Sequence, residues 1–298
     1  MRHSLFFIIL SLFFTSCAFN SKFHHPIKVP MDIDKLTEFS YEEDRTPTYF
    51  QYDKSNSEIS LSNSDRKTIN ENYTIKSSFF SSSSGNLLNG WLLTPKDTKP
   101  IATILHFHGS AQNVLSHYKS IEPLLQYGFQ VFTFDYSGYG FSEGKSTRKN
   151  ALKDAYSAFN YIKKIETIKN TRLIIYGQSY GGYLASIVGS NKQEDIEGLV
   201  IEGAFSAHKD EAKHMSPFFG NLVKNEIKAE NEIQKNFKPV LIIHSVEDKI
   251  VPFKFGEKIF KSANTPKEFY EIDKAHIMGL QYYSKEINAK IKSLILNE

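Results

Sequence analysis

Short apolar runs alternate with amphipathic stretches over most of the chain. Runs of strand length lie at residues 101–109, 129–140, 171–177, 198–203, 238–245 and 267–272. Apolar side chains at helical spacing occur at residues 117–128, 151–165, 180–190, 254–263 and 280–296. Because parallel neighbouring strands need long crossover connections, this alternation predicts an α/β fold with a mainly parallel central sheet and helices on both faces.

The region before residue 101 has a different pattern of apolar and polar residues. Residues 71–80 and 86–95 predict two strands that form a hairpin around the turn-rich segment SSSSGN. Residues 17–72 are polar, show little periodicity and include a Ser/Asn-rich stretch. We therefore predict that residues 17–72 are mostly a tether and a surface arm, and that the folded domain spans residues 73–298.

Composition limits the classes of protein to be considered. The chain has 298 residues, of which 40% are hydrophobic, enough for one sizeable core. Its 36 basic and 33 acidic residues give a net charge of only +3 and form no dense basic block, so nucleic acid is not expected as a partner. The single cysteine excludes an intrachain disulfide.

That cysteine, Cys17, follows a segment typical of export signals. The sequence MRHSLFFIILSLFFTSC has a basic start at Arg2, an apolar stretch over residues 5–14 and small residues before the cysteine. It resembles a bacterial lipoprotein signal, which predicts removal of residues 1–16 and lipidation of Cys17. The expected location is then the membrane of the bacterial cell envelope. A plain secretory signal, with a periplasmic or secreted product, and a mis-assigned start are the alternatives.

One serine has a setting that suggests nucleophilic chemistry. In LIIYGQSYGG, Ser179 lies between a predicted strand and a predicted helix, with Gly177 and Gly181 two residues to either side. A sharp strand-to-helix turn exposes a serine hydroxyl and aims the N–H groups of the helix at a developing oxyanion. Glycines at these two positions would leave room for such a turn.

A nucleophilic serine needs a base and an acid that orients the base. Downstream, Asp248 follows the predicted strand in KPVLIIHSVED, and His276 lies in the loop after the next strand. Serine, acid and histidine in this chain order are typical of that turn. Glu202 and Glu247 are alternative acids. The interpretation favours Asp248 as the residue that orients His276.

These motifs together resemble the α/β-hydrolase superfamily, and within it the small group with an HGxAxN motif after the third strand. The matching segments are HGSAQN (108–113), FDYSGYGFSEG (134–144), GQSYGG (177–182) and HSVEDKIVP (244–252), with the late histidine. The resemblance implies an α/β-hydrolase fold and a catalytic domain over residues 73–298. It also implies an oxyanion hole formed by the backbone N–H groups of Ser110 and Tyr180.

Other residues allow plainer interpretations. His106 and His108 share one face of a predicted strand, but no third ligand with recognisable spacing follows, so no metal site is predicted. We interpret them as buried, hydrogen-bonded histidines that support the oxyanion loop. Asp135 is interpreted as a turn former. Three apolar residues between Gly203 and Phe237 allow two interpretations, which both remain open. Met215, Phe218 and Phe219 could line an acyl pocket, or they could form the buried face of a crossover.

The predicted function is a serine hydrolase that cleaves carboxylic esters or thioesters through an acyl-enzyme. No cofactor is needed. The expected substrates are small-molecule or lipid acyl esters. The expected partner is a membrane, to which the lipid anchor would attach the protein. The interval between Gly203 and Phe237 leaves room for only a small cap over the site. A serine peptidase or acyltransferase of the same fold, and a surface-tethered binding protein without catalysis, are the alternatives.

Overall fold

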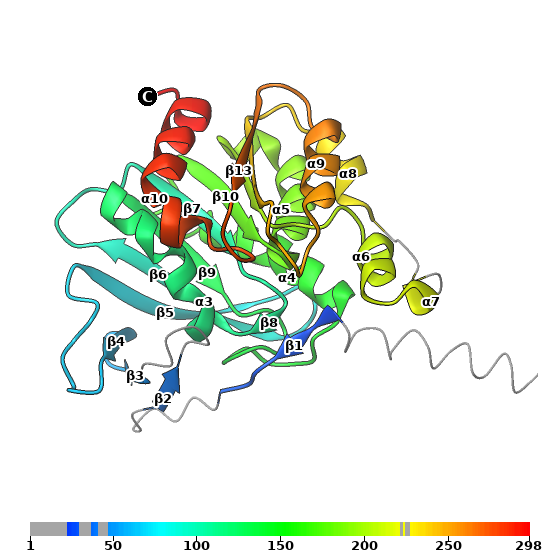
Figure 1. Cartoon of the computed structure of the whole chain (residues 1–298). Coiled ribbons are helices and arrows are strands. Elements are labelled where there is room, and N and C mark those ends of the chain that lie inside the picture. Colours follow the sequence, from blue (N-terminus) through cyan, green and yellow to red (C-terminus); the bar gives the residue numbers. More distant parts are fainter. Residues whose placement is uncertain (1–22, 30–36, 41–46, 221–222, 224–226) are drawn as a thin grey trace, which may run out of the picture.

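The computed structural model describes residues 23–29, 37–40, 47–220, 223 and 227–298. Its main feature is one large twisted sheet with helices on both sides (Figure 1). In the described residues the sheet has eleven strands. Their bounds are β2 (Thr37–Ser40), β3 (Pro47–Asp53), β4 (Glu58–Ser62), β5 (Tyr73–Ser81), β6 (Leu87–Pro95), β7 (Ala102–Phe107), β9 (Phe129–Phe134), β10 (Leu173–Gln178), β11 (Gly198–Glu202), β12 (Val240–Ser245) and β13 (Lys267–Ile272).

The strand order is β13-β12-β11-β10-β7-β9-β6-β5-β4-β3-β2. The strands from β13 to β9 are all parallel, whereas every pair from β9 to β2 is antiparallel. The predicted parallel core and the predicted hairpin of β5 and β6 are therefore both confirmed. The antiparallel part is larger than expected, because the N-terminal region adds strands at the far edge.

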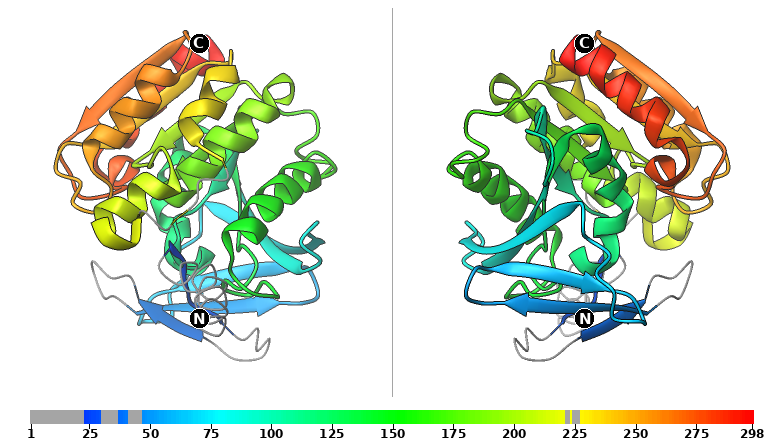
Figure 2. Two further views of the ribbon diagram at one scale, coloured as in Figure 1. Left: turned by 90° about the vertical axis from the view of Figure 1, so that its right-hand side faces the viewer. Right: turned by 90° about the vertical axis from the view of Figure 1, so that its left-hand side faces the viewer.

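Helices cover both faces of the sheet, as predicted (Figure 2). One face packs on α4 (Arg148–Ile162), α5 (Tyr180–Asn191) and α9 (Phe253–Ser262). The other packs on α3 (Val114–Ile121), α10 (Gly279–Lys290) and the π-helical turn η4 (Ile291–Leu296). Successive side chains of a strand point to opposite faces of the sheet. Ile175 of β10 lies in the first core cluster, and Ile174 and Tyr176 lie in the second.

The helix expected at residues 117–128 differs in detail. The α-helix begins earlier, after the N-cap Asn113, and a 3₁₀ segment, η1 (Glu122–Tyr127), replaces its second half. Pro123 explains the change, because it has no N–H to donate to the carbonyl oxygen four residues earlier and its ring crowds the preceding turn. Gly128, with φ of 89°, ends the segment at the predicted position.

The small cap consists of short helices. Between β11 and β12 the described residues form α6 (His208–Met215), α7 (Pro217–Gly220), α8 (Ala229–Glu232) and the 3₁₀ turn η3 (Ile233–Lys235). Figure 1 shows α6 and α7 at one side of the sheet, next to the N-terminal segment. Phe23 of that segment packs against His208 of α6, with ring centroids 5.2 Å apart.

The N-terminal region is more than a tether. Strands β3 and β4 extend the sheet, with Leu61 fully buried and Phe50 only 1% exposed. The ring of Phe50 stacks on Trp91, with centroids 5.9 Å apart. The expectation of a surface arm is therefore wrong for residues 47–62. Ile59 and Leu61 alternate with polar residues in EISLS, and the surrounding serines and asparagines mask this short strand pattern.

The predicted signal segment and Cys17 lie outside the described residues. Across the ranges that the structure describes, no helix has the length and apolar character needed to span a bilayer.

The packing of β3 on the domain can be tested by replacing Phe50. We expect Phe50→Ala to lower the free energy of unfolding by about 3–5 kcal/mol, because it opens a cavity against Trp91. Phe79→Ala, at a residue that is 40% exposed, is the control and should cost much less. Denaturant unfolding measures both changes. Equal and small effects would show that the arm does not belong to the cooperative core.

Candidate active site

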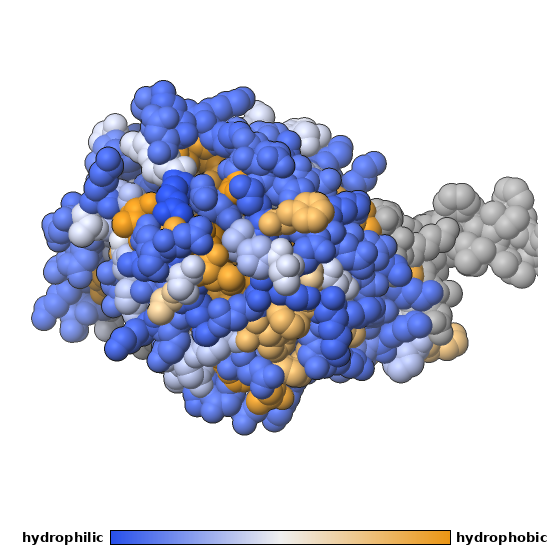
Figure 3. All heavy atoms as spheres, turned by 90° about the horizontal axis from the view of Figure 1, so that it is seen from above, coloured by the Kyte–Doolittle hydropathy of each residue, from blue (hydrophilic) through white to orange (hydrophobic). Residues whose placement is uncertain are grey.

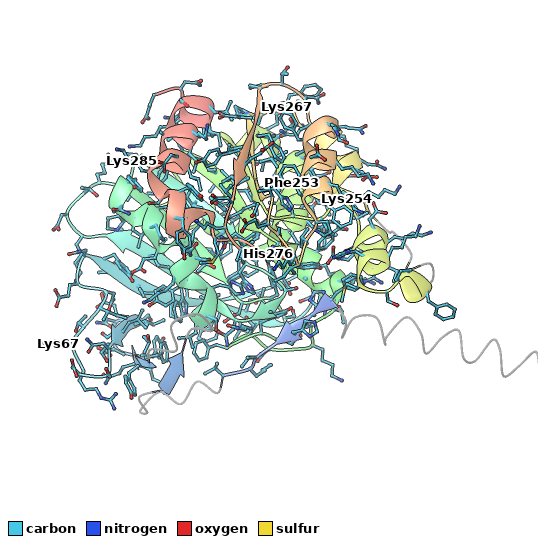
Figure 4. The ribbon with its side chains drawn as sticks, viewed as in Figure 1. Lys67, Phe253, Lys254, Lys267, His276 and Lys285 are labelled. Atoms are coloured by element: carbon cyan, nitrogen blue, oxygen red, sulfur yellow. The ribbon has the colours of Figure 1, made fainter. Side chains whose placement is uncertain are left out.

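The three residues of the predicted triad follow three parallel strands and lie at the same edge of the sheet. Ser179 comes directly after β10, Asp248 lies three residues beyond β12, and His276 lies four residues beyond β13. The carboxyl ends of parallel strands meet at a common edge, which is where open α/β sheets place their sites. Figure 4 shows His276 near the centre of the molecule, between β13 and the N-terminal segment.

The backbone at Ser179 is strained. Its φ of 54° and ψ of −119° lie outside the regions that side chains favour. The turn is also tight: a Cβ atom on Gly181 would lie 1.8 Å from the carbonyl oxygen of Phe107, and one on Gly177 would lie 2.2 Å from that of Gly181. The two glycines thus occupy positions where only hydrogen fits. This is the geometry that the GQSYG pattern predicts.

Asp248 and His276 form a short hydrogen bond, with 2.6 Å between Oδ2 and Nδ1. Asp248 also accepts backbone N–H groups from Ile250 at 2.9 Å and Val251 at 2.8 Å through Oδ1. Burial opposes ionisation, but the hydrogen bond to His276 and the two backbone donors together bring the pKa of Asp248 below its usual value. An ionised acceptor places the imidazole proton on Nδ1, which leaves Nε2 able to take a proton.

Glu202, the alternative acid, has other partners. It is 1% exposed, and Oε2 accepts hydrogen bonds of 2.8 Å from the Tyr176 hydroxyl and the Gln178 amide. Its Oε1 accepts the N–H of Gly279, the first residue of α10, at 2.7 Å. Burial raises the pKa of Glu202. Glu202 therefore joins α10 to the sheet, and Asp248 is the acid hydrogen-bonded to His276.

The loop that carries Ser110 is held at both of its flanking peptides. His108 donates from Nδ1 to the carbonyl oxygen of Gly109 at 2.7 Å, which fixes the peptide plane that includes the Ser110 N–H. The carbonyl oxygen of Ser110 accepts the Tyr139 hydroxyl at 2.7 Å and the backbone N–H of His25 at 2.9 Å. Tyr180 begins α5, where N–H groups have no partner inside the helix.

These groups open onto one cavity of about 410 Å³. Ser179, His276, Ser110 and Tyr180 all line it. The remaining wall comes from the N-terminal segment, α6 and the loop after β12. Its residues include Phe23, His25, Glu211, His214, Met215 and Ile250. A second cavity, of about 730 Å³, adjoins the first at His117, Lys249 and His276.

Sequence reasoning missed the part played by Phe23 and His25. Strand β1 (His25–Pro26) pairs in parallel with β8 (Ala111–Gln112), directly after the predicted oxyanion residue. Both strands have only two residues, and the partner segments are far apart along the chain. No local pattern could therefore have signalled this pairing.

Glu211 is a second residue that the sequence did not single out. It is 7% exposed, and its Oε2 has no hydrogen-bond partner among the described residues. Burial and the nearby charge of Asp248 raise the pKa of Glu211 to about 7. The cavity therefore contains a carboxyl group that titrates near neutral pH.

His106 is buried and hydrogen-bonded, as expected. Its partners, however, are Thr133 of β9 at 3.0 Å and Gln178 of β10 at 3.1 Å, so it is His108 and not His106 that supports the loop of Ser110. Within the described ranges no group of three or more histidine, cysteine or acidic side chains could hold a metal ion. Asp135 accepts the N–H groups of Val114 at 2.8 Å and Phe141 at 3.3 Å, which confirms its role in shaping the loop.

Two of the three apolar residues singled out between Gly203 and Phe237 are not buried. Met215 is 50% exposed and lines the cavity at Ser179, and Phe218 is 77% exposed. The side chain of Phe219 lies outside the described residues. The interpretation as a buried face is therefore wrong for Met215 and Phe218.

Comparison with known proteins assigns the chain to a family that has this fold. A family profile described as "alpha/beta hydrolase fold" matches residues 102–236. The protein YfhR of Escherichia coli K12, described as uncharacterized, is 33% identical over 205 residues, which cover 66% of this chain and 72% of YfhR. The chain belongs to the α/β-hydrolase family.

More distant relatives share the domain. Protein bem46 of Schizosaccharomyces pombe is 31% identical over 157 residues, covering 50% of this chain and 52% of bem46. Human alpha/beta hydrolase domain-containing protein 17B is 27% identical over 203 residues, covering 66% of this chain and 67% of that protein.

Solved structures of esterases share the fold. The Pyrococcus furiosus esterase Pf2001 superposes with a TM-score of 0.64 at 20% identity, over 75% of this chain and 92% of that one. Est1E from Butyrivibrio proteoclasticus, with ferulic acid bound, gives a TM-score of 0.62 at 20% identity, over 74% of this chain and 98% of Est1E. The fold of this chain is thus one that esterases use.

The buried carboxyl of Glu211 should make the stability of the protein depend on pH. Its raised pKa means that the folded state binds a proton more tightly than the unfolded state, so Glu211 costs stability as the pH rises from about 4.5 to about 7. We expect Glu211→Gln to raise the free energy of unfolding at pH 8 relative to the wild type, by up to about 3 kcal/mol. The gain should shrink towards pH 5. Thermal unfolding at both pH values measures it, and a gain that is larger at pH 5 would contradict the assignment.

Proposed function

We propose that the protein is a serine hydrolase that cleaves carboxylic esters or thioesters. The observation that carries this proposal is the hydrogen bond between Asp248 and His276 beside a serine on a strained turn, with Ser179 and His276 lining the same cavity. The α/β-hydrolase fold and its esterase neighbours support a hydrolase. The site residues and the type of ester are the parts that this proposal adds.

In the proposed reaction, the Ser179 hydroxyl attacks the substrate carbonyl while Nε2 of His276 takes its proton. The N–H groups of Ser110 and Tyr180 donate to the oxyanion of the tetrahedral intermediate. His276 then protonates the leaving alkoxide or thiolate, and an acyl-enzyme remains on Ser179. Water, deprotonated by His276, attacks this acyl group and releases the carboxylic acid. Asp248 holds the imidazole in the required tautomer and stabilises its charged form.

The surroundings of the site suit this chemistry. Ser110 sits on a loop held by His108, Tyr139 and His25, so its N–H is oriented before the substrate binds. Only short helices cover the cavity, which favours an open, accessible pocket. The reaction uses side chains, backbone N–H groups and water, and it requires no cofactor.

Replacement of the serine tests the proposal directly. We expect Ser179→Ala to reduce the hydrolysis of p-nitrophenyl esters by at least about 10³-fold, because the acyl-enzyme cannot form. Ser186→Ala, at a buried serine of α5 whose hydroxyl donates to the Gly182 carbonyl, is the matched control. Unchanged turnover in the Ser179 variant would refute the catalytic assignment, and turnover absent from the wild type would favour a binding protein.

The identity of the acid has its own pair of variants. Asp248→Asn should lower kcat by about 10³- to 10⁴-fold, because the imidazole loses its orienting carboxylate. Glu202→Gln should change kcat far less, since Glu202 bonds to Tyr176, Gln178 and Gly279. The opposite ranking of the two variants would assign the acid to Glu202.

We also propose that the protein is exported and held at a membrane by acyl chains on Cys17. The support is the sequence of residues 1–17, with its basic start, short apolar stretch and terminal cysteine. Cys17→Ser should move the protein from the detergent phase to the aqueous phase in a Triton X-114 partition. A variant that stays in the detergent phase as fully as the wild type would contradict lipidation at Cys17.

A further inference from the structure

The N-terminal segment, residues 23–29, lies against the catalytic cavity. Phe23 and His25 form part of its wall, and the N–H of His25 bonds to the carbonyl of Ser110 at 2.9 Å. The same segment continues along the loop around Gly140, where Ile27 accepts the Gly140 N–H at 2.9 Å and Val29 donates to its carbonyl at 3.1 Å. The chain upstream of Phe23 therefore starts at the mouth of the cavity.

Covalent length limits how far Cys17 can be from this mouth. Five residues lie between Cys17 and Phe23, so their Cα atoms are six residue steps apart along the chain. A fully extended chain spans at most about 3.3–3.6 Å per residue, so the Cα atoms of Cys17 and Phe23 are at most roughly 22 Å apart. With acyl chains on Cys17, the cavity mouth would lie within about that distance of a bilayer surface.

Two exposed apolar side chains line this cavity, and a third follows in the same cap segment. Met215 and Ile250 line the cavity and are 50% and 60% exposed, and Phe218, three residues beyond Met215, is 77% exposed. We call these three residues the apolar rim. Figure 3 shows that apolar residues on the face seen from above occur in small groups among hydrophilic ones. A cluster of large exposed apolar residues around a cavity marks a surface that contacts another molecule.

Lysines accompany the apolar rim. Lys213 and Lys249 are exposed and belong to the segments that carry Met215 and Ile250. Lys254 is exposed near the start of α9, which packs on α6 through Phe255 and His214, with ring centroids 6.5 Å apart. Figure 4 shows Lys254 on the side of the molecule that carries α6 and α7. Lysines beside exposed apolar residues fit anionic headgroups above an acyl boundary.

We propose that the apolar rim and these lysines bind the surface of an anionic lipid bilayer, and that the catalytic cavity takes an ester-bearing lipid from that bilayer. This inference rests on the proposed hydrolase function and adds the source and class of its substrate. The acyl or alcohol part of the lipid enters beside Phe23 and Met215, where its ester reaches Ser179. The anchor at Cys17 and the rim then act on the same membrane.

The test measures vesicle binding without the anchor. We use the chain from residue 17 with Cys17→Ser, which keeps every residue that the structure describes, and follow its co-flotation with phosphatidylethanolamine–phosphatidylglycerol vesicles. Two substitutions made together, Phe218→Ser and Lys254→Glu, should reduce vesicle binding by about tenfold or more. Hydrolysis of p-nitrophenyl acetate should not change, since neither residue lines the cavity.

The control pair is Phe237→Ser and Lys285→Glu. Phe237 is 71% exposed but precedes the start of β12, at the edge of the sheet opposite to the site. Lys285 is exposed on α10, and Figure 4 shows it away from α6 and α7. This pair makes the same chemical changes elsewhere, so vesicle binding should stay at the wild-type level.

The results separate the two proposals. Vesicle binding that the rim pair weakens and the control pair does not, together with a matching loss of activity on a fluorogenic lipid ester in the vesicles, supports the membrane face. Absent binding, equal effects of the two pairs, or a rim that instead mediates a dimer in size-exclusion chromatography would overturn it. If hydrolysis of the soluble ester is also absent from the wild type, the hydrolase proposal fails as well.

Discussion

The tight turn at Ser179 is the constraint on which the rest of the site depends. It brings the first residues of α5 within contact distance of β7, so that Gly181 abuts the carbonyl oxygen of Phe107. That contact sets how closely the helix approaches the loop that carries Gly109 and Ser110. A side chain on either flanking glycine would move the serine away from the two N–H groups proposed to bind the oxyanion. The parallel sheet beneath holds the strain, because β10 is buried between β7 and β11.

Long-range contacts complete the site around this turn. Asp248 and His276 come from two loops beyond adjacent parallel strands, and the carboxylate is fixed by backbone donors before it meets the imidazole. On the opposite side, the N-terminal segment contributes a wall and one of the hydrogen bonds that hold Ser110. The positions of Ser179, Asp248 and His276, the shape of the cavity and the path of residues 23–29 are therefore coupled in one structure.

The sequence predicted the parts of the fold that depend on local patterns. Continuous apolar runs marked the buried strands, and Gly177, Ser179 and Gly181 marked the turn because only glycine fits beside it. The order of Ser179, Asp248 and His276 indicated residues that the sheet then places at one edge. The resemblance to α/β-hydrolases pointed to the loop at Ser110, whose supporting bonds the sequence could not show.

The remaining features depend on contacts between distant segments. Phe50 and Leu61 lie in a polar stretch of sequence, and they are recognised as core residues only from their contacts with Trp91 and the rest of the second core cluster. His25 pairs with a loop that lies far along the chain, and two-residue strands leave no periodicity to detect. The burial of Glu211 follows from the packing of α6, not from its neighbours in sequence. The split of the 117–128 helix, by contrast, could have been foreseen from Pro123.

The most direct test of the central claim is the reaction of the purified protein with a fluorophosphonate probe, with the modified peptide mapped by mass spectrometry. We expect one stoichiometric adduct on Ser179, formed at a rate that falls sharply in His276→Ala because the base is lost. No adduct in a protein shown to be folded, or an adduct on another serine, would contradict the claim that Ser179 is an activated nucleophile.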